Sequence, residues 1–253
     1  ARGGGNARSG YIQRIFWCNT HSYCRKMSII VTILLICLAL FVAANIFLVW
    51  ASADVGSNVY VKAYCKGQTE QRCVALTFDD GPHAKNTTKV LDVLKRHEVR
   101  ATFFLVGENV ERHPELVARM VGEGHIVANH TLSHDAKFPL WSRIKVEDNI
   151  MACSDAIYRA AGRRTRLFRP PFGVTVPAIG KAMSALGHNV IGWSIRSYDT
   201  MRRSSRKSVA KRVIKRLHPG AIILLHDRCE GAEELLEDII TQGRARGYSF
   251  VAL

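Results

Sequence analysis

Acidic residues are scarce in this chain of 253 residues, and one long stretch carries no charge at all. Asp and Glu together number 21 against 36 Lys and Arg, which gives a formal charge of +15. Such a balance suits an anionic polymer, a nucleic acid or an anionic membrane surface. Internal repeats and low-complexity tracts are absent, and the hydrophobic content is an ordinary 47%. These features exclude a disordered or collagen-like chain and indicate a globular protein.

The stretch without charge covers residues 27–53, which contain no Asp, Glu, Lys, Arg or His. Within it, the run 29–50 has only Thr32 and Asn45 as polar residues, and its length exceeds the ~20 residues that a helix needs to cross a bilayer. The basic segment 1–26 contains no acidic residue, so the positive-inside rule keeps it cytoplasmic. We predict a transmembrane signal anchor over 27–53, with the rest of the protein on the periplasmic or cell-wall side of the cell membrane.

Two alternatives to this interpretation remain open. Ala51-Ser52-Ala53 has the small-x-small pattern of a signal-peptidase site, and cleavage after Ala53 would release a secreted protein. Met27 is an alternative start, in which case residues 1–26 are not native. The bulk of the chain is exported in either case.

Cysteine spacings typical of zinc fingers are also absent, because none of the seven cysteines forms a Cys-x-x-Cys pair. Four cysteines follow the apolar stretch and are expected in an oxidising compartment. Cys65 and Cys73 flank a short polar loop and could close a disulfide there, but two free thiols are an equally simple interpretation.

The exported part begins with a linker and entry segment, residues 54–72, and then alternates brief apolar runs with stretches of helical period. We expect strands at 73–78, 101–106, 125–129, 167–169, 189–193, 221–225 and 248–253. We expect helices around 90–94 and at 114–122, 144–161, 177–186, 208–217 and 232–242. Strands separated by helices form parallel neighbours. The pattern predicts an α/β fold, a distorted or incomplete (β/α) barrel of about seven parallel strands over residues 73–253.

Two adjacent carboxylates, Asp79 and Asp80, stand where the first of these strands enters a Gly-Pro turn. Neighbouring residues on a strand point to opposite sides, so the pair can serve one site only if the turn redirects one of them. The alternative is a plain turn or a helix cap.

Two imidazoles, His130 and His134, follow the third strand at a spacing of four residues. One helical turn would bring them onto one face. Two His and one Asp make three ligands, a count typical of a catalytic zinc site with a fourth position for water. The alternative is two unrelated surface histidines.

The position of these residues favours the functional interpretation. Working residues of parallel β/α folds sit at the carboxyl ends of the strands. Five of the seven expected strands end at or just before such residues: Asp79 and Asp80, His130, Arg169, Trp193 and His226. Scattered turns and caps would not place polar and aromatic groups on one rim so regularly.

The motifs TFDDGP, HTLSH, RPPFG, GWSIRSYD and LLHD, in this order, resemble those of the polysaccharide deacetylase family, also called the NodB-homology family or carbohydrate esterase family four. The resemblance covers residues 73–253. It implies a distorted (β/α) barrel, one divalent metal ion that is usually taken as Zn²⁺, with Co²⁺, Ni²⁺ or Mn²⁺ as alternatives, and hydrolysis of acetyl groups on sugars.

Carried over by motif, the metal ligands would be Asp80, His130 and His134, while Asp79 would act as general base and His226 as general acid. Amide hydrolysis needs these roles, because water must be activated and the leaving amine protonated.

The remaining motif residues would support this chemistry. Asp199 would keep His226 protonated, and Arg169 would hold Asp79 as a carboxylate. A backbone N–H near Phe172 would stabilise the oxyanion, and an apolar slot for the acetyl methyl would be lined by Trp193 and Leu224. The alternative for Arg169 is a salt bridge at the strand end, and that for Asp199 is a loop cap. The alternative for Trp193 and Leu224 is ordinary packing beneath the site. The family's tyrosine is replaced by Phe172, and the aromatic residue after the fourth-motif aspartate is missing.

A basic stretch without acid, residues 202–216, forms either a solvated face or a site of attraction to an anionic cell-wall polymer or lipid. We do not expect nucleic-acid binding, because the chain is exported.

The sequence thus predicts a membrane-tethered deacetylase of N-acetylglucosamine in a cell-envelope polysaccharide, with peptidoglycan as the first candidate and chitin oligomers or poly-N-acetylglucosamine as others. An O-acetyl esterase of xylan-like glycans and a catalytically idle glycan-binding protein are the alternatives.

Overall fold

The computed structural model describes residues 6–201 and 205–253, and the chain divides into two compact units, Ala1–Trp50 and Ala51–Leu253. The described part of the first unit is helical and belongs to α1 (Asn6–Ala53). Its segment Arg25–Ala53 is long and apolar enough to cross a membrane, and it contains the predicted stretch. Both polar side chains of the run donate to carbonyls one turn back, Thr32 to Ser28 and Asn45 to Phe41, each at 2.8 Å. Arg2 of the basic segment lies outside the described residues.

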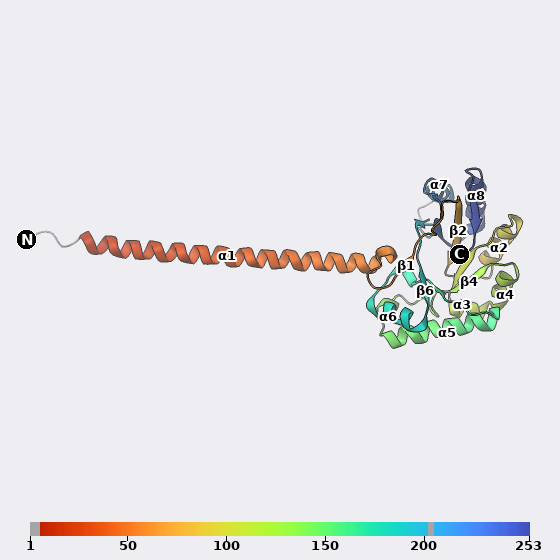
Figure 1. Ribbon diagram of the computed structural model, residues 1–253, viewed down its shortest axis with the longest axis horizontal. Helices are drawn as coiled ribbons and strands as arrows, with labels where there is room; N and C mark the ends of the chain where they lie inside the picture. The colour runs from red at the N-terminus through yellow and green to blue at the C-terminus, as the bar shows by residue number, and fades with distance from the viewer. Residues whose placement is uncertain (1–5, 202–204) are drawn as a thin grey trace, which may run out of the picture. The chain divides into compact units, whose positions relative to one another are not determined.

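The second unit is built on one sheet of nine strands (Figure 1). The strands are β1 (Ala63–Tyr64), β2 (Cys73–Asp79), β3 (Thr102–Leu105), β4 (Ile126–Asn129), β5 (Leu167–Phe168), β6 (Asn189–Ile191), β7 (Ile195–Arg196), β8 (Ile222–His226) and β9 (Ser249–Val251). Their order is β1-β6-β5-β4-β3-β2-β8-β7, with β9 beside β2, and all of these pairs are parallel. Because β1 and β7 end the order, the sheet curls without closing, and the predicted incomplete barrel is confirmed.

Helices surround the sheet in Figure 1. They are α2 (Asn86–Arg96), α3 (Gly107–Arg112), α4 (Pro114–Gly122), α5 (Arg143–Ala161), α6 (Pro177–Leu186), α7 (Arg206–Lys215) and α8 (Ala232–Arg244). Local sequence sets several ends: the Ser142 side chain caps α5, and Gly162 ends it in the left-handed region at φ 64°. Proline opens α4 and α6, where its missing N–H costs nothing.

One face of β2 packs in the hydrophobic core, and the other face is on the side of the site. Leu76 and Phe78 pack outward in the main hydrophobic core with residues of the surrounding helices. Ala75 faces inward, where it packs with Phe104 and other buried apolar residues. Alternation along the strand therefore places Asp79 on the same inward face as Ala75.

All seven expected strands exist, but two strands and one helix were missed. β1 and β7 have two residues each, too short for a periodic signal, and α3 follows β3 directly. The disulfide alternative is wrong, because Cys65 and Cys73 are both free. Cys65 follows β1, whereas Cys73 begins β2. Four strands lie between β1 and β2 in the sheet, so the two thiols are on separate strands.

Candidate active site

The turn after β2 redirects one of its two carboxylates, as the sequence required. Asp79 ends the strand, and Asp80 adopts a left-handed backbone conformation at φ 73°. The Asn109 side chain of α3 donates to the carbonyl of Asp80 at 2.9 Å and holds this turn. Gly81 must lack a side chain here, because an added Cβ would lie 2.3 Å from an oxygen of buried Asp227. Both aspartates therefore reach the same cavity.

The histidines do not share a helical turn, and this part of the prediction is wrong. Thr131 and His134 have positive φ, 71° and 48°, so the segment is an irregular loop. The side chain of Asn129 accepts from the N–H of Thr131 at 2.8 Å, and that of Asn149 accepts from Leu132 at 2.9 Å. These bonds replace the backbone pairing of a helix. The loop still brings both imidazoles to Asp80.

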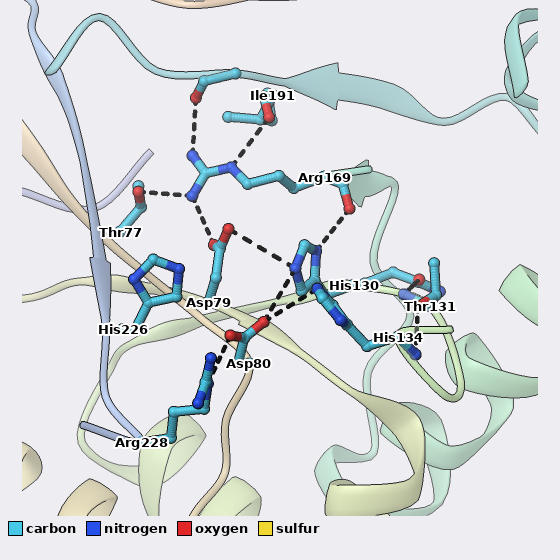
Figure 2. A network of polar contacts seen from close by, with 12 residues as sticks. Thr77, Asp79, Asp80, His130, Thr131, His134, Arg169, Ile191, His226 and Arg228 are labelled. Carbon is cyan, nitrogen blue, oxygen red and sulfur yellow. Dashed lines mark hydrogen bonds and ion pairs between the residues drawn. The ribbon is translucent and has the colours of Figure 1, made fainter. Parts of the chain in front are cut away.

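Asp80, His130 and His134 form a group that could hold a metal ion, with ligand atoms within 4.8 Å of one another (Figure 2). Asp80 Oδ1 lies 3.4 Å from His130 Nε2 and 3.3 Å from His134 Nε2. His130 Nδ1 lies 2.7 Å from the carbonyl of Arg169, which can only accept, so the proton sits on Nδ1. This leaves the Nε2 lone pair for a cation, as metal-binding histidines require. The residues present therefore fit a divalent metal.

The charge states of this group also suit a metal. Burial alone would raise the pKa of Asp80, but the hydrogen bond and charge of His130, with His226 and Arg228, lower it far below its usual range. Burial, followed by the charge of His130, lowers the pKa of His134. At neutral pH Asp80 is thus a carboxylate and His134 a neutral imidazole, the forms that bind metals.

Asp79 is held by a fully buried arginine. Arg169 Nη1 donates to Asp79 Oδ1 at 2.7 Å and to the Thr77 hydroxyl at 2.8 Å. Its other nitrogens donate to the carbonyls of Ile191 and Gly192 (Figure 2). A buried guanidinium with its donors satisfied in this way fixes the orientation of the carboxylate. The expected pair of Arg169 and Asp79 is therefore present.

His226 ends β8 beside Asp199. Its Nδ1 lies 2.8 Å from Asp199 Oδ1, and its backbone N–H donates to Asp199 Oδ2 at 2.7 Å. Burial alone would lower the pKa of His226, but the hydrogen bond and charge of Asp199, with the charges of Asp79 and Asp80, raise it above its usual value. The pair that motif order suggested is thus in contact.

One cavity of about 210 Å³ brings these residues together. Its lining includes both aspartates of the turn, His130, His134 and His226, together with Phe172, Gly173, Trp193, Arg196, Thr200, Leu224 and Arg228. Phe172 has φ 60°, and its ring packs edge-on against His134 at 4.7 Å between centroids. Trp193 approaches so closely that a Cβ on Gly173 would lie 2.4 Å from its ring. The expected apolar residues Phe172, Trp193 and Leu224 therefore all line the cavity.

Three charged residues of this region were not foreseen. Arg228 Nε donates to Asp80 Oδ2 at 2.7 Å, which leaves Oδ1 facing the histidines (Figure 2). Arg196 lines the cavity wall. Asp227 is fully buried, which raises its pKa to about 7, and it accepts from the Thr87 hydroxyl beneath the turn. Asp227 lies in the motif LLHD and Arg196 in GWSIRSYD, but neither motif indicated what these two side chains contact.

Comparison with known proteins identifies relatives of this chain. The family model described as polysaccharide deacetylase matches residues 66–191. A peptidoglycan-N-acetylmuramic acid deacetylase of Bacillus subtilis is 35% identical over 194 residues, 76% of this chain and 73% of the relative. The chain belongs to the polysaccharide deacetylase family. Members of this family are hydrolases that act on acetylated sugars.

Solved structures of the family share the fold. A peptidoglycan N-acetylglucosamine deacetylase superposes with a TM-score of 0.71 and 34% identity, over 75% of this chain and 89% of that structure. A pseudoenzyme of carbohydrate esterase family four from Bacillus anthracis gives a TM-score of 0.70 at 26% identity, over 76% and 67%. Because the fold occurs with and without activity, the residues of the cavity must decide what this chain does.

Proposed function

We propose that the protein removes N-acetyl groups from N-acetylglucosamine-containing peptidoglycan on the outer side of the cell membrane. One observation carries this proposal: a triad fit for a metal, a carboxylate paired with arginine and a histidine paired with aspartate all line one cavity. Amide hydrolysis needs a base for water, charge stabilisation for the oxyanion and an acid for the leaving amine. An idle glycan-binding protein would not need this complete set.

Asp80, His130 and His134 would hold the divalent metal, with Zn²⁺ as the first candidate. When bound, such an ion polarises the acetyl carbonyl and activates water. Asp79 lies near the same nitrogen of His130 as Asp80, with Oδ2 3.8 Å from Nε2. There it accepts the proton of the attacking water, while the hydrogen bond from Arg169 holds its orientation.

The leaving amine requires a proton as its bond to the acetyl carbon breaks. His226 supplies this proton, and Asp199 keeps the imidazole charged until then. The products are acetate and a free amine on the sugar. A backbone N–H at Phe172 stabilises the oxyanion, and the acetyl methyl lies against Trp193 and Leu224. An O-acetyl esterase would need the same groups, except that an ester leaving group depends less on the acid.

The metal assignment is tested by elemental analysis of the full-length protein. His130→Ala and His134→Ala should each lose the metal, since each removes one of three ligands. His113→Ala, at the junction of α3 and α4, serves as the matched control and should retain it. Chelation should abolish acetate release, and added Zn²⁺ or Co²⁺ should restore it. Unchanged metal content in both ligand variants would contradict the assignment.

The substrate assignment is tested by acetate release from peptidoglycan, chitin oligomers, poly-N-acetylglucosamine and acetylated xylan. The proposal expects the highest rate on peptidoglycan. A higher rate on acetylated xylan would instead support the esterase, and a metal-loaded protein inactive on all four would support the binding protein.

Membrane tethering is the last part of the proposal. The 29 residues Arg25–Ala53 exceed what a helix needs to span the ~30 Å hydrocarbon core. The two polar side chains of the run hydrogen-bond within the helix, as a lipid environment demands. Protease added to intact spheroplasts should remove the catalytic unit from the cells. A soluble exported form that begins at Asp54 would instead show cleavage after Ala53.

A further inference from the structure

Arg196 is a cation in the cavity wall that the protein does not neutralise. Its side chain is exposed and lines the same cavity as the three candidate metal ligands. Within residues 6–201 and 205–253, no carboxylate lies within ion-pair distance of its guanidinium. The eight residues outside these ranges, ARGGG and RRS, contain no Asp or Glu. The charge of Arg196 is therefore available to a ligand.

Aromatic contacts hold this guanidinium at the cavity. Arg196 Cζ lies 5.7 Å from the ring centroid of Trp193 and 5.1 Å from that of Tyr198. Tyr198 adopts φ 59°, and Arg212, which donates to the carbonyl of Ser197 at 2.7 Å, packs over the same ring. Cation–π contacts fix a guanidinium without using its N–H donors. Arg196 thus keeps its donors free for a planar anion.

The other charges of the cavity are already paired within the protein. The two carboxylates of the lining each contact a cation, Asp79 with Arg169 and Asp80 with Arg228. His226 of the lining contacts Asp199, which is not part of the lining. Asp80 would offset only part of the charge of a divalent cation on the triad, and the charge of Arg196 has no carboxylate partner among the residues that line the cavity. A cavity with such a surplus attracts a negatively charged substrate.

We propose that Arg196 binds a carboxylate on the glycan, carried by the reacting sugar or by its neighbour, and so selects acidic glycans over neutral polymers of N-acetylglucosamine. In peptidoglycan every second sugar is an N-acetylmuramic acid, whose lactyl carboxyl is a free carboxylate wherever the stem peptide has been removed. The fork of a guanidinium matches a carboxylate with two parallel hydrogen bonds. This inference rests on the proposed function and narrows its substrate class.

The test compares two soluble strands of equal length. One alternates N-acetylglucosamine with N-acetylmuramic acid after removal of the peptides, and the other contains only N-acetylglucosamine. The wild-type protein should prefer the acidic strand, and this preference should weaken as salt is added. Mass spectrometry of the products then shows whether the deacetylated sugar is the one that bears the carboxylate or its neighbour.

Substitutions at Arg196 should change the selectivity. Arg196→Gln should lower the ratio of kcat/KM on the acidic strand to that on the neutral strand by about 10- to 100-fold, the usual value of a charged hydrogen bond. Arg196→Lys should retain part of the preference, and Arg196→Glu should reverse it. Lys207→Gln, an exposed charge change on α7 outside the cavity lining, is the matched control and should keep the wild-type ratio.

Two results would overturn the inference. The first is a wild-type protein that shows no preference for the acidic strand, because Arg196 then selects nothing. Equal losses on both strands in Arg196→Gln would make Arg196 a structural part of the wall formed by Trp193 and Tyr198. Calorimetric measurement of binding to the same strands distinguishes failure of this inference from failure of the proposed function. If no strand releases acetate, the proposed function fails. The role of Arg196 is still supported in that case if Arg196→Gln weakens binding of the acidic strand alone.

Discussion

Removal of the charge on Asp199 should move the pH range in which the enzyme works. Asp199 contacts His226 twice, through Nδ1 at 2.8 Å and through the backbone N–H at 2.7 Å. These contacts outweigh the effect of burial and raise the pKa of His226. Asp199→Asn keeps the shape of the side chain but loses its negative charge. The charges of Asp79 and Asp80 then remain as the main opposition to burial, and the pKa of His226 should fall.

The size of the effect follows from the contact. An opposite charge at hydrogen-bond distance commonly shifts a pKa by about 1–3 units, so loss of the charge on Asp199 should lower the pKa of His226. His226 acts in its protonated form, which is lost as the pH rises through its pKa. The alkaline limb of kcat/KM should therefore move about 1–3 units toward acid, and the rate above this limb should fall about tenfold for each unit.

The assay is a pH–rate profile on a soluble N-acetylated oligomer with the metal present in excess. The contact between Arg169 and Asp79 is intact in the variant, so a change confined to the alkaline limb reports on His226. Ser197→Ala is the matched control: it removes a hydroxyl that donates to Asp199 Oδ1 at 2.8 Å and leaves the charge in place, so its profile should shift far less. A loss of rate in Asp199→Asn that is uniform across pH would refute the reasoning and leave Asp199 a positioning residue only.

Two other outcomes test different parts of the molecule. Asp79→Asn should retain the metal but lose about 10²–10⁴ in kcat, because the base is gone; an active variant that binds metal would show that Asp79 is only a turn residue. A chain that begins at Asp54 lacks the carbonyls of Ala51 and Ser52, which accept three hydrogen bonds, one from Ser57 and two from Thr175. At about 1 kcal/mol for each bond, this chain should unfold at a temperature about 6–12 °C lower than one that begins at Trp50. Equal melting temperatures, measured by calorimetry, would show that these residues add nothing to the fold.

Periodicity in the sequence was enough to predict the class of fold and the place of most elements. The strands of four or more residues and the helices with proline at the start or glycine at the end were all foreseen, and α6 has the expected bounds, Pro177–Leu186. Short elements escaped because two residues carry no period: β1 and β7 are strands only through their neighbours β6 and β8. β2 and β3 are buried on both faces, so their sequences are continuous apolar runs. Such runs are typical of central strands in a parallel sheet.

The residue types of the site were predictable, but their arrangement was not. Pairs of Asp and His at strand ends indicate a metal site whatever the local backbone does. The backbone itself depends on positive φ values at Asp80, Thr131, His134 and Phe172. Non-glycine residues adopt this region rarely and only where the surrounding structure holds them there. Arg196 in β7 and Arg228 just after β8 were not foreseen either, because their contacts with the cavity depend on how the strands are placed side by side.

The helix that the sequence did not reveal explains how the two loops meet. The backbone N–H of Val106 donates to Gly81 in the aspartate turn, and the next N–H, that of Gly107, donates to Thr131 in the histidine loop. A Cβ on Gly107 would lie 2.8 Å from the side chain of Leu132, so the histidine loop packs directly on this point. The start of α3 therefore joins both loops through adjacent peptide groups. These two backbone hydrogen bonds set the distance from Asp80 to the histidines. The site stays aligned because β3 is hydrogen-bonded to both β2 and β4.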